Sequence, residues 1–367
     1  MDRKLLWYTL WVAIFTAIAF MLLRHQSLLS LSNALHGAKG GALVTKVSLE
    51  KLLPQERAVK HIGATFERIQ LHAKPGRSAG KEVVRKGYLF RRPTAVATVI
   101  MFHGFMCDKT DILFLGSMFK DYNLLAFDFR GHGEDTAGQC CTFGADEAFD
   151  VLAAVEFVRA DQQMAKLPLI AYGFSMGAVS SIQAHAKFGP LFDCAIWDCP
   201  FDSTAELLAR CISVLKLNIL GYSFVLPGRK FLKKYAYNRY VQSLLKMALK
   251  TVANMDASQV ETQMVPVDTV ASAQKVSIPA YYIVCKNDGK APPTAVRRLY
   301  DASLGFKRLW VTNGRRHFDS FFYNPDEYAH RIQKFIKKFL DGRLSKQRTE
   351  KIIYDPDTQA QKQPISL

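Results

Sequence analysis

The chain has 367 residues, of which 49% are hydrophobic and 22% charged. That length can bury a full core, and the composition excludes a mainly disordered or low-complexity chain. The formal net charge of +17 indicates attraction to an anionic partner, either nucleic acid or an acidic lipid surface. Seven cysteines form no Cys-x-x-Cys pair and no zinc spacing, so most are expected to be buried thiols. A metal site and a disulfide framework are therefore not favoured, although a single bridge stays open.

The first notable element is an uncharged apolar run at residues 5–23, which basic residues flank on both sides. A helix of that length, at about 1.5 Å per residue, nearly spans a hydrocarbon core of about 30 Å. We therefore predict a single-pass membrane anchor within residues 1–25 and a linker over 26–63, with the rest of the chain favoured on the non-cytoplasmic side. The alternative is a cleaved secretory signal, although its small-x-small pattern at 32–34 lies well downstream of the apolar run.

Short β-like runs alternate with helix-like segments from residue 64 onward. The run at 95–102 is apolar enough for a central strand that is buried on both faces. This alternation predicts an α/β fold over 64–340, with a mostly parallel central sheet flanked by helices and reactive groups at the carboxyl ends of the strands. Residues 341–367 are expected to form a polar C-terminal tail. The expected strands are 64–72, 83–90, 95–102, 124–127, 167–172, 194–197, 280–284 and 309–311.

A Gly-x-Ser-x-Gly motif, with Ser175 at its centre, follows the apolar run at 167–172 and precedes a helix-like segment. A strand, this turn and a helix together are typical of a nucleophile elbow, which lifts a serine hydroxyl clear of the backbone. Gly173 and Gly177 would let the strand and the helix approach closely, and the Met176 N–H would face a developing oxyanion. Ser175 is the predicted nucleophile.

An acyl-transfer serine needs a base and an orienting carboxylate, and the chain order Ser, acid, His is typical of one particular fold. Asp288 follows the expected strand at 280–284, which suits the acid, and His317 follows the next strand, which suits the base. Asp198 and Asp202 follow the strand before these and are the alternative acids. Other histidines in helix-like sequence, such as His185 and His330, are expected to be core or surface residues.

A second donor for the oxyanion is expected from the loop that begins His103-Gly104-Phe105, directly after the run at 95–102. Gly104 permits a close backbone approach, so the Phe105 N–H could join the Met176 N–H around the oxygen of a tetrahedral intermediate. The ring of His103 is expected to be structural.

The motif that begins at His103, the segment 128–133, the Gly-x-Ser-x-Gly motif, Asp288 and His317 follow one another along the chain. With these motifs in this order, the chain resembles the α/β-hydrolase superfamily over about residues 64–340. The resemblance implies the α/β-hydrolase fold, a Ser-Asp-His triad, structural roles for Asp128 and His132, and no cofactor. Asn313-Gly314-Arg315-Arg316-His317 departs from the commoner Gly-x-Gly-His form around the base. The motifs that carry the resemblance are His103-Gly104, Asp128-Phe129-Arg130-Gly131-His132-Gly133, Gly173-Phe174-Ser175-Met176-Gly177, Asp288 and His317.

Two segments, Asp128 to Gly133 and Trp197-Asp198-Cys199-Pro200-Phe201, are most similar to one branch of that superfamily. The branch contains serine aminopeptidase-like proteins, monoacylglycerol lipases and membrane-anchored acyl-protein or lipid hydrolases.

The alternation of β-like and helix-like segments is interrupted at about 203–275. At this place the family that the chain resembles has a helical cap over the active site. Within it, residues 228–250 carry basic side chains and no acidic one, interleaved with aromatic and aliphatic residues. Such a pattern favours contact with an anionic bilayer, although a solvated basic face over an ordinary cap is an equal alternative. No nucleic-acid-binding motif accompanies the charge, so nucleic-acid binding is not expected.

Together these features predict a membrane-anchored serine hydrolase that cleaves an ester or thioester of an acyl lipid or lipidated substrate through an acyl-enzyme. One alternative is an aminopeptidase-like serine peptidase with the same triad, and a small soluble ester or peptide stays open as substrate. Another alternative is a catalytically silent, membrane-tethered scaffold, because a fold does not fix a function. The sequence does not predict the oligomeric state.

Overall fold

The computed structural model describes residues 65–77, 83–134, 136, 138–214, 216–219, 222–225, 234–235, 237–238, 240–243, 260–344 and 351–355. The predicted anchor at 5–23 and linker at 26–63 lie outside these residues, as does most of the basic segment at 228–250. No helix within the described part of the chain combines the length and the apolar character that a bilayer crossing requires.

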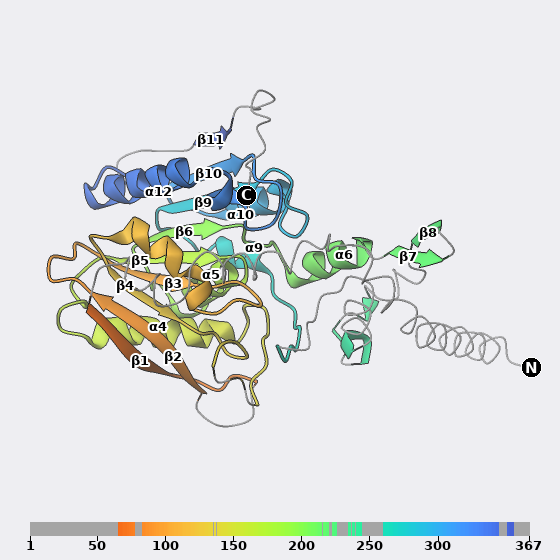
Figure 1. Ribbon diagram of the computed structural model, residues 1–367, viewed down its shortest axis with the longest axis horizontal. Coiled ribbons are helices and arrows are strands. Elements are labelled where there is room, and N and C mark those ends of the chain that lie inside the picture. The colour runs from red at the N-terminus through yellow and green to blue at the C-terminus, as the bar shows by residue number, and fades with distance from the viewer. Residues whose placement is uncertain are drawn as a thin grey trace, which may run out of the picture. The chain divides into compact units, whose positions relative to one another are not determined.

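A nine-stranded sheet forms the centre of the fold, in the order β1-β2-β4-β3-β5-β6-β9-β10-β11 (Figure 1). β1 and β2 pair antiparallel, β2 pairs antiparallel with β4, and all later pairings are parallel. The predicted mostly parallel sheet is therefore confirmed. Its strands are β1 (Thr65–Ala73), β2 (Val83–Arg91), β3 (Thr98–Phe102), β4 (Asn123–Phe127), β5 (Leu169–Phe174), β6 (Cys194–Asp198), β9 (Ala280–Cys285), β10 (Lys307–Thr312) and β11 (Lys351–Tyr354).

Side chains of the central strands alternate between two hydrophobic clusters, one on each face of the sheet. In β3, Ile100 and Phe102 belong to one cluster, while Val99 and Met101 belong to the other. Successive side chains of a strand point to opposite faces, so a strand that is buried on both faces must be apolar throughout. This burial explains the continuous apolar run in the sequence.

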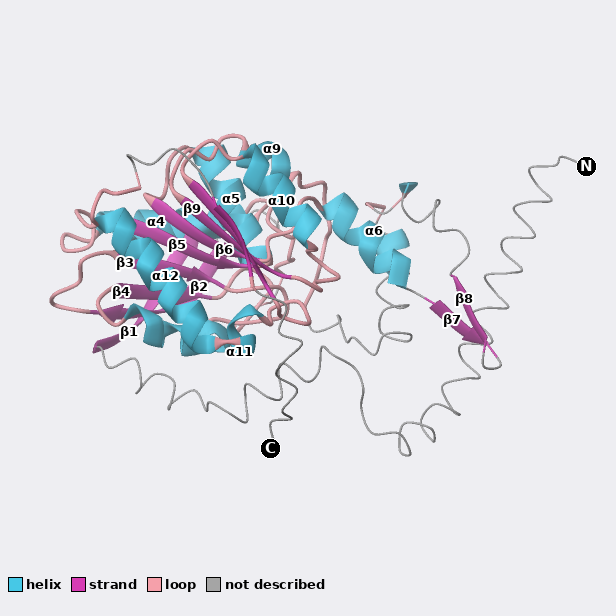
Figure 2. Cartoon of the chain, turned by 90° about the horizontal axis from the view of Figure 1, so that it is seen from above, coloured by secondary structure: helices cyan, strands magenta, loops and turns pink. Residues whose placement is uncertain are grey.

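Helices cover both faces of the sheet (Figure 2). One cluster receives residues of α4 (Glu147–Ala160), α5 (Met176–Phe188) and α10 (Pro293–Ala302). The other receives residues of the 3-10 helix η1 (Thr110–Phe119) and of α12 (Pro325–Leu340). The flanking layers predicted from the strand and helix alternation are therefore present.

The described part of the expected cap contains more than helices. It includes α6 (Thr204–Val214), the antiparallel pair β7 (Lys216–Ile219) and β8 (Tyr222–Val225), and α9 (Thr269–Ala273). The short strands and the helix α6 lie where the sequence predicted a helical insertion, so the structure adds a hairpin to that expectation.

The segment predicted as a polar tail contains an edge strand, β11, which pairs parallel with β10. Ile352 packs against one hydrophobic cluster and Ile353 against the other. Four residues are too short a run to stand out in a polar segment, because a strand is recognised by alternation over several positions.

Candidate active site

Ser175 lies in a sharp turn between β5 and α5, with φ 49° and ψ −113°. A positive φ is uncommon outside glycine, so the surroundings must hold this conformation. The Ser175 N–H donates to the main-chain oxygen of Asp198 at 2.9 Å, and the Ser175 carbonyl accepts from the Val179 N–H at 3.1 Å. The turn therefore has the geometry of the predicted nucleophile elbow.

The two glycines of the motif lie where no side chain would fit. A Cβ atom at Gly177 would meet the main-chain oxygens of Phe102 at 2.3 Å and His103 at 2.5 Å. A Cβ atom at Gly173 would meet the Cα atom of Ala178 at 2.6 Å. Close packing of α5 on β3 and β5 requires glycine at both positions, as the motif predicted.

Gly177→Ala is expected to lower the free energy of unfolding by about 3 kcal/mol or more, because the added methyl group would press against two backbone carbonyls. Chemical denaturation would measure the change. The matched control is Gly289→Ala, since Gly289 has no positive φ and a Cβ atom there meets nothing within 4 Å. A Gly177→Ala protein as stable as the control would contradict this packing.

The structure brings Ser175, His317 and Asp288 into one hydrogen-bonded relay. His317 Nε2 lies 2.7 Å from Ser175 Oγ, and His317 Nδ1 lies 2.7 Å from Asp288 Oδ2. The other carboxylate oxygen of Asp288 accepts from the N–H groups of Lys290 at 2.8 Å and Ala291 at 2.9 Å. When Nδ1–H donates to Asp288, Nε2 is left to accept the serine proton.

Neither alternative acid occupies the position beside Nδ1 of the imidazole. The carboxylate of Asp198 accepts a hydrogen bond from the hydroxyl of Tyr328 at 2.8 Å. Asp202 forms an ion pair with Arg210, in which Oδ1 of Asp202 lies 2.6 Å from Nη2 of Arg210. Of the three candidate acids, Asp288 is therefore the one whose carboxylate contacts Nδ1 of the imidazole.

Met176 follows Ser175 directly, and the loop that carries Phe105 approaches Ser175 at Gly104. A Cβ atom at Gly104 would lie 3.0 Å from the Phe174 ring and 3.6 Å from Ser175 Cβ, so the loop approaches the serine closely. Met176 is the first residue of α5, where an N–H group has no acceptor within the helix. The donation of the Phe105 and Met176 N–H groups to an oxyanion stays a prediction.

Two buried histidines hold the loop that follows β3. His132 Nε2 accepts from the Met106 N–H at 3.2 Å, and His103 Nε2 accepts from the Phe129 N–H at 2.9 Å. Each Nδ1 faces a main-chain carbonyl, so both rings are neutral with the proton on Nδ1. Burial lowers the pKa of His103 to about 4 and that of His132 to about 3. These rings therefore have structural roles.

The segment from Asp128 to Gly133, which follows β4, takes part in two buried ion pairs. Asp128 accepts from the backbone N–H of Lys109 at 2.8 Å and from its Nζ at 2.7 Å, and both side chains are buried. Arg130 and Asp150 form a second buried ion pair. Sequence analysis missed Lys109, because nothing in its local pattern indicates that a lysine will pair with a distant aspartate.

Cys199 is another neighbour that sequence analysis did not place at the site. It follows β6 with φ 44°, and its Sγ lies 3.9 Å from His317 Nε2. Cys199, Asp288 and His317 form the one group in the described part of the chain that could hold a metal ion. Burial raises the pKa of the Cys199 thiol well above its usual range, which opposes the thiolate that a metal prefers. Asp288 and His317 are already hydrogen-bonded in the relay with Ser175, so these two residues suit proton transfer better than metal binding.

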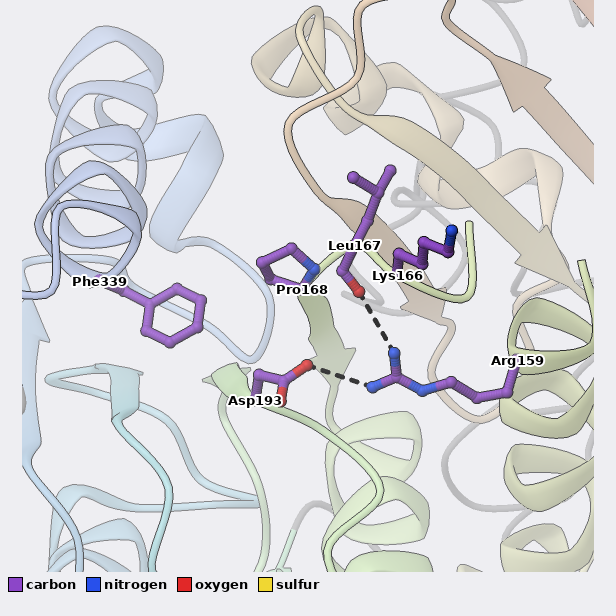
Figure 3. A pocket seen from close by; sticks show the side chains of 6 residues that line it. All are labelled: Arg159, Lys166, Leu167, Pro168, Asp193 and Phe339. Carbon is purple, nitrogen blue, oxygen red and sulfur yellow. Dashed lines mark hydrogen bonds and ion pairs between the residues drawn. The ribbon is translucent and has the colours of Figure 1, made fainter. Parts of the chain in front are cut away.

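A surface hollow of about 390 Å³ lies at the other end of β5 from Ser175 (Figure 3). In it, the guanidinium of Arg159 bridges the carboxylate of Asp193 and the main-chain oxygen of Leu167. Because catalytic groups of such sheets gather at the carboxyl ends of strands, this hollow is separate from the relay. The residues that line it are Arg159, Lys166, Leu167, Pro168, Asp193 and Phe339.

This chain is similar to known proteins in sequence or in fold. The chain is 26% identical over 262 residues to YqkD of Bacillus subtilis, described as uncharacterized, covering 70% of this chain and 76% of that protein. The esterase Pf2001 of Pyrococcus furiosus superposes with a TM-score of 0.56 at 20% identity, over 77% of this chain and 95% of that chain. A 2,6-dihydroxy-pseudo-oxynicotine hydrolase gives a TM-score of 0.55 at 16% identity, over 81% and 76%.

A family model described as the alpha/beta hydrolase family matches residues 99–331, a span that holds the whole hydrogen-bonded relay. Since this match covers more than half of the chain, and the sheet order and elbow agree with it, the chain belongs to the alpha/beta hydrolase family.

Proposed function

We propose that this protein is a serine hydrolase that cleaves an ester or thioester through an acyl-enzyme on Ser175. The observation that carries the proposal is the continuous relay, in which His317 lies 2.7 Å from both Ser175 Oγ and Asp288 Oδ2. Distances in this range are those required between a nucleophile, its base and the group that orients the base.

In the proposed reaction, Ser175 Oγ attacks the acyl carbonyl while His317 Nε2 takes the serine proton. The imidazolium then gives that proton to the leaving alcohol or thiol, and water repeats the sequence to release the acid. Asp288 holds the imidazole tautomer and stabilises its charged form. The N–H groups of Met176 and Phe105 would stabilise the oxyanion, and the loss of one such donor typically costs about 3 kcal/mol.

We further propose an acyl lipid or a lipidated molecule as substrate. Aromatic side chains lie beside the base: Phe318 follows His317 directly, and its ring centroid lies 3.6 Å from that of Phe174. Phe114 extends this cluster to Phe322, with 5.5 Å between centroids, and Phe322 is partly exposed. Phe174 and Phe318 are buried and Phe322 is exposed, so these rings make the surroundings of the base apolar, which supports a substrate with a hydrocarbon chain over a small polar one.

The membrane placement rests on the sequence. The apolar run at 5–23 supports a single-pass anchor with the catalytic domain on the non-cytoplasmic side, and the basic segment at 228–250 supports contact with anionic lipid. Both would deliver acyl substrates to Ser175 from the bilayer. We also propose that the chain belongs to the serine aminopeptidase-like and monoacylglycerol lipase-like branch, which the segments 128–133 and 197–201 resemble.

A substrate panel on the full chain in detergent tests the bond and the chain length. It would contain p-nitrophenyl acetate and laurate, an S-palmitoyl peptide and an aminoacyl p-nitroanilide. We expect laurate to exceed acetate in kcat/KM by at least about tenfold, since each buried methylene contributes about 0.8 kcal/mol. Turnover of the anilide alone would favour a peptidase. A folded protein without turnover or fluorophosphonate labelling would favour the scaffold.

A further inference from the structure

Asp198 is a buried carboxylate that the proposed mechanism does not use. It is the last residue of β6, the strand between β5, which leads into Ser175, and β9, which leads into Asp288. Its side chain is 1% exposed, and its main-chain oxygen accepts the N–H of Ser175. Asp198 therefore lies at the carboxyl end of the sheet, between the strand that leads to the nucleophile and the strand that leads to the acid.

The side chain of Asp198 connects β6 to both helices that follow the base. Its Oδ2 accepts from the Tyr328 hydroxyl on α12 at 2.8 Å, and Tyr328 is hydrogen-bonded to Tyr172 of β5. Its Oδ1 accepts from Ser320 Oγ at 3.5 Å. Ser320 begins α11 (Ser320–Tyr323), three residues after His317. One carboxyl group thus anchors the chain on which the base is carried.

The groups that face this carboxyl are neutral or negative. They are Tyr172 of β5, Cys199, Cys285 at the end of β9, Asp288, Ser320 and Tyr328. The pKa of Asp198 is raised to about 7, mainly because of burial and also because of the charge of Asp288, while the hydrogen bonds from Tyr328 and Ser320 oppose the rise. Cys199, which also contacts Asp198, has its Sγ 3.9 Å from His317 Nε2. The imidazole of His317, which Cys199 contacts, gains a positive charge during the proposed reaction.

We propose that Asp198 is a positioning residue, a second carboxylate that anchors the chain carrying His317 and whose negative charge stabilises the imidazolium. This inference rests on the proposed serine hydrolase function. In a poorly solvated site an ionised carboxylate favours the protonated form of a nearby imidazole, because little water screens the attraction. Proton transfer from Ser175 creates that positive charge, so an ionised Asp198 would lower the barrier.

The test compares wild type with Asp198→Asn, a substitution of the same shape that keeps an acceptor for Tyr328 and removes the charge. The readout is kcat/KM for p-nitrophenyl acetate between about pH 5 and about pH 9. We expect the maximum to fall about tenfold and the acid limb to move down by about one pH unit, because Asp198, with a pKa raised to about 7, no longer contributes its charge or its own titration. An acid limb that coincides with that of the wild type would overturn the charge effect.

Ser320→Ala separates anchoring from charge, because it removes one hydrogen bond and keeps the carboxylate. Its maximal kcat/KM is expected to fall, while its acid limb does not move down, because the carboxylate is kept. The matched control is Asp202→Asn, since Asp202 is equally buried, lies four residues further along, and is already paired with Arg210. A downward shift of the acid limb in the control equal to that in Asp198→Asn would also overturn the proposal.

Thermal unfolding distinguishes lost charge from lost packing. The folded-state pKa of Asp198 lies above the unfolded value, so wild type loses stability as pH rises from about 4 through about 7. Asp198→Asn is therefore expected to gain stability relative to wild type above that range. A variant that is less stable at every pH, with an unmoved acid limb, would show a merely structural role. Absence of fluorophosphonate labelling in folded wild type would instead refute the proposed function.

Discussion

Ser175→Ala is expected to lower kcat by about 10⁶-fold and to abolish labelling by a fluorophosphonate probe. Removal of Oγ leaves His317 without a nucleophile to activate, and the members of such a relay act as a unit, so most of the rate enhancement is lost at once. The residual rate would come from the oxyanion donors and from substrate binding alone. Gel-based labelling and ester hydrolysis, both on detergent-solubilised protein, measure the two effects.

Ser180→Ala is the matched control for that experiment. Ser180 is buried on the same helix, and its Oγ donates to the main-chain oxygen of Met176 at 2.8 Å, so the substitution removes a hydroxyl near the elbow but outside the relay. We expect the control to keep labelling and turnover. Persistent labelling of Ser175→Ala would mean that another side chain is the nucleophile, and the proposed mechanism would fail.

The second large effect is expected for Asp288→Asn, with a fall in kcat of about 10⁴-fold. An asparagine amide donates to Nδ1, so the imidazole would carry its proton on Nε2 and could no longer accept the proton of Ser175. Binding is expected to change less, because Asp288 lies on the far side of the ring from the serine. Steady-state kinetics on a short-chain ester would separate kcat from KM.

Asp202→Asn is the matched control for the acid, because it removes an equally buried carboxylate that contacts Arg210 rather than the imidazole. Its activity per folded molecule is expected to stay close to that of the wild type. Substantial activity in Asp288→Asn would show that another carboxylate, with Asp198 the first candidate, can orient His317.

The local sequence does not distinguish the three candidate acids. Asp198, Asp202 and Asp288 all follow strands, so each satisfied the pattern expected of the triad acid. In the structure, the loop after β9 lets Lys290 and Ala291 bind one oxygen of Asp288 and directs the other to the imidazole. The conformation of this loop therefore decides which carboxylate contacts the imidazole. That conformation depends on contacts between segments that are distant in the sequence.

Local patterns were sufficient for the architecture and for Ser175. Continuous apolar runs predicted the central strands because a strand buried on both faces has no position for a polar side chain. The glycines at 173 and 177 predicted the elbow because a side chain there would overlap the backbone of neighbouring elements. Chain order after Ser175 then indicated His317 as the base. The membrane anchor at 5–23 stays a prediction, since it lies outside the described residues.

The sequence by itself determined the α/β fold class and predicted Ser175 as nucleophile and His317 as base, because the spacing of motifs and the requirement for glycine are local properties of the chain. Only the tertiary structure decided that Asp288 is hydrogen-bonded to His317, that Cys199 contacts the same ring, that Asp198 is hydrogen-bonded to Ser320, and that β11 extends the sheet. These outcomes depend on which distant segments meet and at what angle, and long-range packing sets both.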